Sequence, residues 1–324
     1  MTVPMTTGLG VAGGVIQAVI VTAGAPLLAG VMRQVRAKLE GRAGPGVGQP
    51  WRDLRKQFRK EAITPDGTSE IFRLAPLVLL ATTFTAAVAV PFVASASAAG
   101  PLADLFAVVA LLAMGTATLA LAALDTGTAF GGMGASREMT ILALVEPTLL
   151  VSVFALSVRA GSTNLAAIVT ATVHDPARVL SPASLLAAVA LGVVTIAETG
   201  RLPVDNPATH LELTMVHEAM ILEYAGPDLA LVELASSMRL VVFLGLLSSL
   251  FTPWGIATAL TPLALLGGTA AFAAKVAVLG AALAAGEVFM AKIRLFRVPE
   301  LLAGSFLLSL LAVTSSYFLP GPNR

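Results

Sequence analysis

Seven carboxylates gathered in residues 197–233 are the groups in this chain best suited to chemistry. The chain is only 12% charged, and the segment holds seven of its 19 acidic residues: Glu198, Asp205, Glu212, Glu218, Glu223, Asp228 and Glu233. Arg201, His210 and His217 lie among them. Carboxylates in poorly hydrated surroundings have raised and mutually coupled pKa values, so neighbouring ones can exchange protons near neutral pH. We therefore expect a proton path or a binding site here.

Four charged residues, three of them outside this segment, bear on the row of acids. Glu138 and Glu146 are eight residues apart, so on one helix they lie on similar faces and could extend the row into the membrane. Arg201 follows Glu198 by three residues, which is the spacing of an ion pair on a continuing helix. Lys275 stands alone in an apolar run, and it is equally well explained as a paired structural charge or as a relay member.

The same charges also have a structural explanation, in which the acids pair with Arg137, Arg201 and Arg239 and hold helices together. That explanation leaves a surplus of acidic groups. His210 and His217 have a spacing that could ligate a metal or haem, but a hydrogen bond to a carboxylate is favoured, and we expect no metal site. The chain has no cysteine, so it holds no iron–sulfur cluster and no thiolate zinc site.

The composition indicates that a membrane positions these groups. The 324 residues are 56% hydrophobic with a mean hydropathy of +0.87, and several apolar runs reach the roughly 20 residues that cross a bilayer as a helix. Backbone groups in lipid must be hydrogen-bonded internally, so we predict an all-α integral membrane protein with a single membrane domain, residues 1–324. Eight spans are predicted, at residues 8–32, 74–94, 102–124, 138–158, 183–198, 229–251, 257–290 and 301–318.

A basic segment, residues 33–73, follows the first predicted span and carries ten of the 20 Lys and Arg residues. Short loops rich in Lys and Arg stay in the cytoplasm, which places both termini outside. Part of the segment predicts an amphipathic helix at the membrane interface. Its apolar face carries Trp51, Leu54, Phe58 and Ala62. Its basic face carries candidate docking residues for a partner protein or for lipid headgroups, Arg55, Arg59 and Lys60; a solvated basic helix is the simpler alternative.

A helix break is predicted inside the charged segment. Asn206 suits an N-cap and Pro207 suits the first helical position, so a new helix is expected to begin there. At about 100° per residue, its two sides are predicted to carry Glu212 with Glu223, and His210 with His217 and Glu218. Residues 125–137 and 159–182 are predicted to be loops on the inner and outer sides of the membrane.

Three stretches resemble the membrane subunit 1 family of respiratory complex I. They read GRAGPGVGQPWRDLRKQFRKE, REMTILALVEP and AETGRLPVDNPATHLELT, and the similarity covers nearly the whole chain. The longer version AETGRLPVDNPATHLELTMVHEAMILEYAG is more similar to the hydrogenase branch of that family, which includes subunit 4 of formate hydrogenlyase and component C of hydrogenase-4. No P-loop, catalytic triad or zinc motif appears.

The resemblance implies a subunit without a catalytic centre of its own that anchors a peripheral electron-transfer arm to the membrane arm. Family members line a quinone chamber and the start of a glutamate-rich proton path. The family's charged positions are matched by Glu146, Glu198, Arg201, Asp205 and Glu212. Glu218 and Glu223 lie in a stretch, HEAMILEY, that departs from the pattern of the quinone enzymes. This departure weakens the case for quinone binding.

Three functions are compatible with the sequence. The first is a proton-coupling subunit of a membrane-bound nickel–iron hydrogenase in the cell membrane. Its partners would be the hydrogenase large and small subunits, which hold the iron–sulfur and nickel–iron centres, together with antiporter-like membrane subunits and the lipid bilayer, and no nucleic acid. The second is a subunit of a quinone-reducing NADH dehydrogenase with its peripheral arm. The third is a stand-alone cation transporter.

Overall fold

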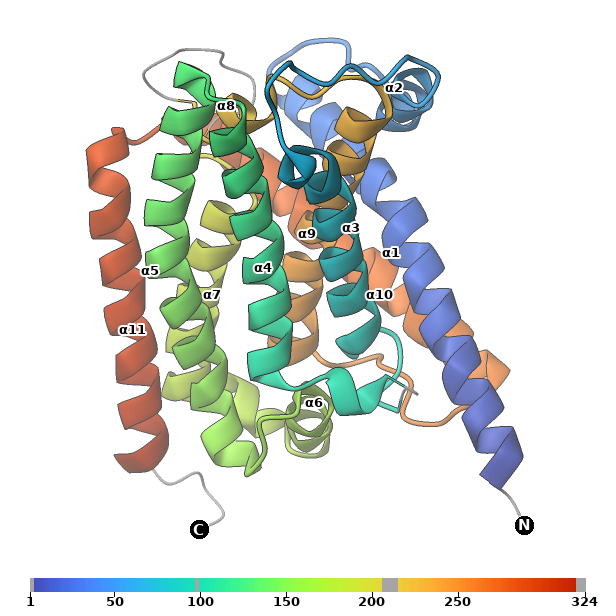
Figure 1. Ribbon diagram of the computed structural model, residues 1–324. Helices are drawn as coiled ribbons and strands as arrows, with labels where there is room; N and C mark the ends of the chain where they lie inside the picture. The colour runs from blue at the N-terminus through green and yellow to red at the C-terminus, as the bar shows by residue number, and fades with distance from the viewer. Residues whose placement is uncertain (1–2, 97–98, 206–214, 319–324) are drawn as a thin grey trace.

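Eight long helices run side by side between the two ends of a bundle (Figure 1). The computed structural model describes residues 3–96, 99–205 and 215–318. The long helices are α1 (Val3–Leu39), α3 (Glu70–Ala89), α4 (Leu105–Asp125), α5 (Ala129–Ala160), α7 (Pro182–Glu198), α9 (Gly226–Phe251), α10 (Pro262–Phe289) and α11 (Val298–Phe318). The beginning of α1 and the end of α11 lie at the same end of the bundle (Figure 1).

The short elements lie at the two ends of the bundle (Figure 1). At the end opposite the termini are α2 (Gln49–Gln57) and α8 (His217–Ile221), and at the termini's end is α6 (Leu165–His174). Three 3-10 turns, Gly100–Leu102, Pro176–Leu180 and Leu295–Arg297, complete the regular structure of the described residues.

The all-α membrane class is confirmed. Among the residues that the structure describes, seven helices are long and apolar enough to cross a bilayer, and each matches one of the predicted spans. The remaining predicted span, residues 183–198, corresponds to α7, an apolar helix of 17 residues that packs between α5, α9 and α11. The helix α9 is central, because it packs against α1, α3, α7 and α10 and 72% of its most apolar stretch is buried. Side chains on α9 therefore face neighbours rather than lipid.

Polar residues begin most of these helices by supplying the hydrogen bonds that the first turn lacks. Ser69, Asp104 and Thr128 accept bonds from backbone amides of α3, α4 and α5. Ser181 and Thr261 do the same for α7 and α10, each of which also has proline in its first turn. Local sequence thus defines where the spans begin.

Three predictions about connecting segments are wrong. Residues 125–137 are not a loop throughout, because Thr128 caps α5 and that helix extends from Ala129. Residues 159–182 contain the helix α6, which Asn164 caps. The helix predicted from residue 207 is not continuous: residues 206–214 lie outside the described part of the chain, Met215 and Val216 are not helical, and α8 is five residues long.

Gln17 on α1 closes the end of α3 inside the bundle. Its Nε2 donates to the carbonyl oxygens of Ala87 at 2.7 Å and Val90 at 2.6 Å. Its Oε1 accepts from the amides of Phe92 and Val93, each at 3.2 Å. A buried backbone group left without a hydrogen bond destabilises the folded state by about 1–3 kcal/mol. The buried Gln17 side chain satisfies several such groups at once.

The change Gln17→Leu keeps the side chain's size and removes all of these bonds. We expect it to destabilise the protein by about 3 kcal/mol or more, because several backbone groups are orphaned together. Thermal unfolding of the purified chain in detergent measures the loss. Gln57→Leu is the matched control, because the Gln57 Oε1 atom is buried without a hydrogen bond. Equal melting temperatures for both variants would contradict this account.

Candidate functional site

Two neighbouring cavities lie at the end of the bundle that carries α2 and α8. The smaller, of about 60 Å³, lies between α4, α5, α7 and α9. The larger, of about 620 Å³, lies between α1, α2, α8, α9 and the end of α10. Both are lined by the same short set of residues from the 199–205 turn, α8 and α9: Thr199, Gly200, Asp205, His217 and Ser236. This set separates the two cavities.

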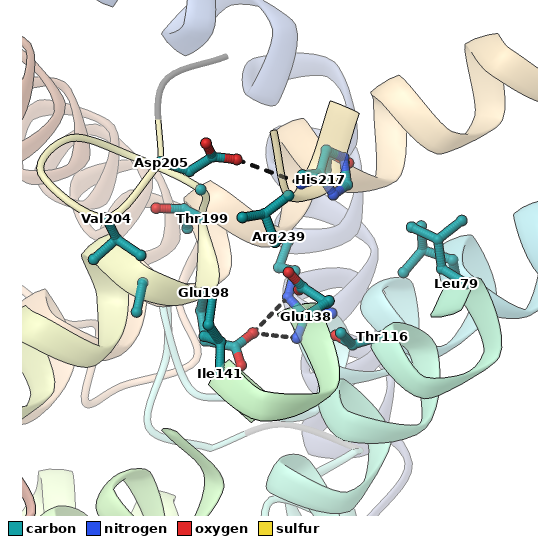
Figure 2. Close-up of a pocket in the computed structure, with 15 residues that line it drawn as sticks. Leu79, Thr116, Glu138, Ile141, Glu198, Thr199, Val204, Asp205, His217 and Arg239 are labelled. Atoms are coloured by element: carbon teal, nitrogen blue, oxygen red, sulfur yellow. Dashed lines mark hydrogen bonds and ion pairs between the residues drawn. The ribbon is translucent and has the colours of Figure 1, made fainter. Parts of the chain in front are cut away.

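The smaller cavity holds a buried ion pair and a second carboxylate. Arg239 of α9 donates from Nε to Glu198 Oε2 at 3.1 Å and from Nη2 to the same oxygen. Its Nη1 donates to the carbonyl oxygen of Leu112 on α4 at 3.1 Å. Glu138 reaches the same space from α5 (Figure 2). Arg239 and Glu198 thus connect α4, α7 and α9, and Glu138 of α5 lies beside their ion pair.

The pair that the sequence predicted between Glu198 and Arg201 does not form. The helix α7 ends at Glu198, and Thr199 and Gly200 then turn the chain. Gly200 has φ of 57°, a conformation that side-chain-bearing residues rarely adopt. Arg201 consequently leaves the helix and lies 3.6 Å from Glu287 Oε1 on α10. Burial lowers the pKa of Arg201, and the Glu287 carboxylate opposes that shift.

The partition between the cavities is a hydrogen-bonded chain. Lys292 Nζ lies 2.7 Å from Asp205 Oδ1. The His217 backbone amide donates to Asp205 Oδ2 at 3.4 Å (Figure 2). His217 Nε2 lies 3.3 Å from Ser236 Oγ. Burial lowers the pKa of His217 and outweighs the opposing effect of Asp205. The imidazole is therefore neutral near pH 7, and a neutral imidazole can both accept and donate a proton.

The structure brings together most, but not all, of the predicted site residues. Glu138 and Glu198 line the smaller cavity, Asp205 and His217 line both, and Arg201 and Glu218 line the larger. Glu146 lies two turns beyond Glu138 on α5 and lines neither cavity, although it interacts electrostatically with Glu198 and Arg239. Glu223 is half-buried and also lines neither. Glu212 and His210 lie outside the described residues.

Lys275 lies far from this site. Its Nζ donates to the carbonyl oxygen of Thr252 at 2.5 Å, and Thr252 is the C-cap residue that follows α9. The residues of α9 that line the cavities lie between Glu233 and Leu240, at least three turns before Thr252. A cation on the last carbonyl groups of a helix is favourable to the helix dipole, so this contact favours the structural explanation of Lys275.

The basic helix forms, but it is shorter than predicted. The helix α2 ends at Gln57, and only Leu54 of its predicted apolar face is buried; Phe58 and Ala62 are exposed. Trp51 Nε1 donates to the carbonyl oxygen of Ala23 on α1 at 3.1 Å. The three predicted docking side chains are all exposed: Arg55, Arg59 and Lys60. Lys60 also lines the larger cavity.

The loop before α2 packs tightly on α1. A Cβ atom at Gly30 would lie 1.9 Å from the carbonyl oxygen of Val47, so glycine allows this approach. About one turn further along α1, Gln34 Oε1 accepts from the Gly46 amide at 3.1 Å. The basic helix is thereby held at the mouth of the larger cavity.

Sequence reasoning missed one buried carboxylate, Glu287, and assigned no functional role to Ser236. Glu287 lies near the end of α10, lines the larger cavity and has a side chain that is 3% exposed. A single carboxylate in an otherwise apolar span is the signal that could have found it. Arg239, which the sequence offers as a structural partner of the acids, is buried within α9.

The fold and its cavities define a multi-pass helical membrane protein with buried carboxylates at one end of the bundle. The chain belongs to the NADH dehydrogenase family, whose model matches residues 12–316. It is 35% identical to formate hydrogenlyase subunit 4 of Escherichia coli (strain K12), over 93% of this chain and 96% of that protein. It is 36% identical to hydrogenase-4 component C of the same organism, over 76% of each. The predicted resemblance is confirmed.

A solved structure shares the fold. A chain in the structure of the membrane-bound sulfane sulfur reductase, an archaeal respiratory membrane complex, superposes with a TM-score of 0.81. The match covers 94% of this chain and 98% of that one at 21% sequence identity. The helix arrangement described above is therefore shared with a subunit of that respiratory complex.

Proposed function

We propose that this chain is the membrane-anchoring, proton-coupling subunit of a multisubunit, membrane-bound nickel–iron hydrogenase of the formate hydrogenlyase type. The two Escherichia coli relatives named above support the hydrogenase assignment. The catalytic redox centres would lie on partner subunits, because a chain without cysteine cannot hold iron–sulfur clusters. In this proposal the chain provides an anchor and a proton route.

The observation that carries the proton-coupling part is the pair of cavities with its shared partition. Carboxylates line both cavities, and His217 and Ser236, which also line both, lie at hydrogen-bond distance from each other. A proton on the larger-cavity side would pass through His217 and Ser236 toward Glu138 and Glu198. In this route Asp205 holds the backbone of His217, so it acts as a positioning residue.

We place no quinone in this reaction. Charged side chains from α1, α2, α8, α9 and α10 line the larger cavity, which suits water and ions better than an apolar isoprenoid chain. The subunit of a quinone-reducing NADH dehydrogenase remains the second candidate, supported by the family description. A stand-alone cation transporter would need no docking surface, whereas α2 presents an exposed basic one.

The end of the bundle with α2 and α8 is proposed to face the cytoplasm, with both termini outside the cell membrane. The basic segment 33–73 lies at that end (Figure 1), and Lys and Arg are concentrated on the cytoplasmic side of membrane proteins.

The subunits that copurify with the tagged chain test the assignment. We expect a nickel–iron large subunit, an iron–sulfur small subunit and antiporter-like membrane subunits, identified by mass spectrometry of a complex purified in mild detergent. A full set of NADH dehydrogenase subunits would instead establish the second candidate. Purification of the chain alone, with ion flux in proteoliposomes, would overturn the proposal in favour of a transporter.

The basic helix gives a further prediction. Reversing three charges with Arg55→Glu, Arg59→Glu and Lys60→Glu should release the peripheral subunits from the membrane, because like charges then face the docking partner. The fraction of hydrogenase activity that sediments with membranes measures this, and we expect it to fall by about tenfold relative to the unaltered complex. The charge-retaining set of Lys and Arg exchanges at the same positions is the control. Intact attachment in the reversed variant would exclude docking through this basic surface of α2 and the residues that follow it.

A further inference from the structure

Glu287 is a buried carboxylate that the proton route above does not use. It lies near the end of α10, within the span but beside the larger cavity, and its side chain is 3% exposed. It does not line the smaller cavity, so it belongs to the wall on the α1 and α10 side. A charge in such a place is costly, and one that persists usually has a function.

The contacts of Glu287 are looser than those of its neighbours. Its Oε1 lies 3.6 Å from Arg201 Nη1 and its Oε2 lies 3.9 Å from Arg36 Nη1, both beyond hydrogen-bond length. The Oε1 atom is buried and has no hydrogen-bond partner. By contrast, Asp205 is only 2.7 Å from Lys292 Nζ. Glu287 is thus balanced by two cations without being bonded to either.

Arg36 is also engaged elsewhere, which explains the loose contact. Its Nε donates to Glu40 Oε1 at 3.0 Å, and Glu40 in turn pairs with the exposed Arg42. Arg201, the other cation, is fixed in the turn that follows α7. Neither guanidinium lies within hydrogen-bond length of Glu287, so its buried Oε1 atom, beside the larger cavity, has no donor.

From this geometry we propose that Glu287 is a second proton-exchanging residue of the site, which takes a proton from water in the larger cavity and returns it there. Protonation forms one O–H bond on Oε1 and leaves hydroxide or a deprotonated carrier in the cavity, with no electron transfer. The charged form is stabilised at a distance by Arg201 and Arg36. Protonation removes the negative charge that no hydrogen-bond donor stabilises at Oε1. The inference rests on the proposed proton-coupling function.

The variant Glu287→Gln in the assembled complex tests this. The amide keeps the shape of the side chain but cannot exchange a proton, so we expect proton transfer coupled to turnover to fall by at least about tenfold. Difference infrared spectroscopy on proton uptake gives a second reading: a carboxyl C=O band should be present in the unaltered complex and missing in the variant. Glu300→Gln, an exposed carboxylate at the start of α11, is the matched control.

Several outcomes separate this inference from the function on which it rests. Unchanged coupling and an unchanged infrared band in Glu287→Gln would overturn the role of Glu287, while loss of coupling in Glu138→Gln would leave the proton route standing. Unchanged coupling in both variants would overturn the proposed function itself. If Glu287→Gln fails to assemble, Glu287→Asp is measured instead. An unaltered pH profile and an unshifted carboxyl band in that variant would also overturn the proposal.

Discussion

Replacing Arg239 with Met is expected to destabilise the bundle by about 3–5 kcal/mol, the largest loss we anticipate for any single change at the site. The substitution leaves Glu198 buried with its hydrogen-bonding cation removed, and the Glu198 side chain is only 5% exposed. It also removes the hydrogen bond to the Leu112 carbonyl oxygen on α4. Thermal or denaturant unfolding of the purified chain measures the loss.

The double variant Arg239→Met with Glu198→Gln should recover most of that stability. A neutral amide no longer needs a cationic partner, and buried pairs replaced on both sides are often nearly neutral. Arg73→Met is the matched control, because Arg73 and Glu70 form an exposed ion pair with side chains 58% and 75% exposed. Such pairs contribute about 1 kcal/mol or less. If Arg239→Met and Arg73→Met unfold alike, the buried pair does not hold these helices together.

Replacing Glu138 with Gln is expected to abolish most coupled proton transfer while the complex still assembles. Glu138 lines the smaller cavity beside the Glu198–Arg239 pair, and among the described residues no cation forms an ion pair with it (Figure 2). An amide of the same shape cannot carry a proton onward. We expect a loss of at least about 100-fold, the low end of the contribution of a positioned acid or base.

Two measurements test this prediction: the hydrogenase turnover, and the proton movement into inverted membrane vesicles that accompanies it. The matched control is Glu70→Gln, which removes an exposed carboxylate at the beginning of α3. Assembly is checked by the amount of complex recovered. If Glu138→Gln retains the full turnover and the full proton signal, Glu138 lies outside the route and the smaller cavity has only a structural role.

Some of the buried acids fit the structural explanation, and others fit the functional one. Glu198 is held by Arg239 and Asp205 lies against Lys292, as a purely structural explanation requires. Glu138 and Glu287 have no comparable hydrogen-bonded cation among the residues described, and both line cavities. The acids with a hydrogen-bonded cation, Glu198 and Asp205, can therefore hold the site in place. The acids without one, Glu138 and Glu287, can exchange protons.

By itself the sequence determined the membrane class, the family and the position of nearly every span. These properties depend on local quantities: the length of apolar runs, the capping residues beside them and motifs that are contiguous in the chain. The concentration of acids at one end of the bundle was also predictable, because residues close in sequence must lie close in space. The prediction of loops at 125–137 and 159–182 was wrong because segments capped by Thr128 and Asn164 form helices there.

Only the tertiary structure decided which charge meets which. Arg201 was predicted to pair with Glu198 three residues away, yet the turn at Gly200 sends it to Glu287, and Glu198 pairs instead with Arg239 on α9. Such partners are separated by dozens of residues, and helix packing selects them because a buried charge must find a counter-charge wherever the bundle supplies one. The two cavities and their shared partition arise in the same way, from gaps between helices that no local pattern encodes.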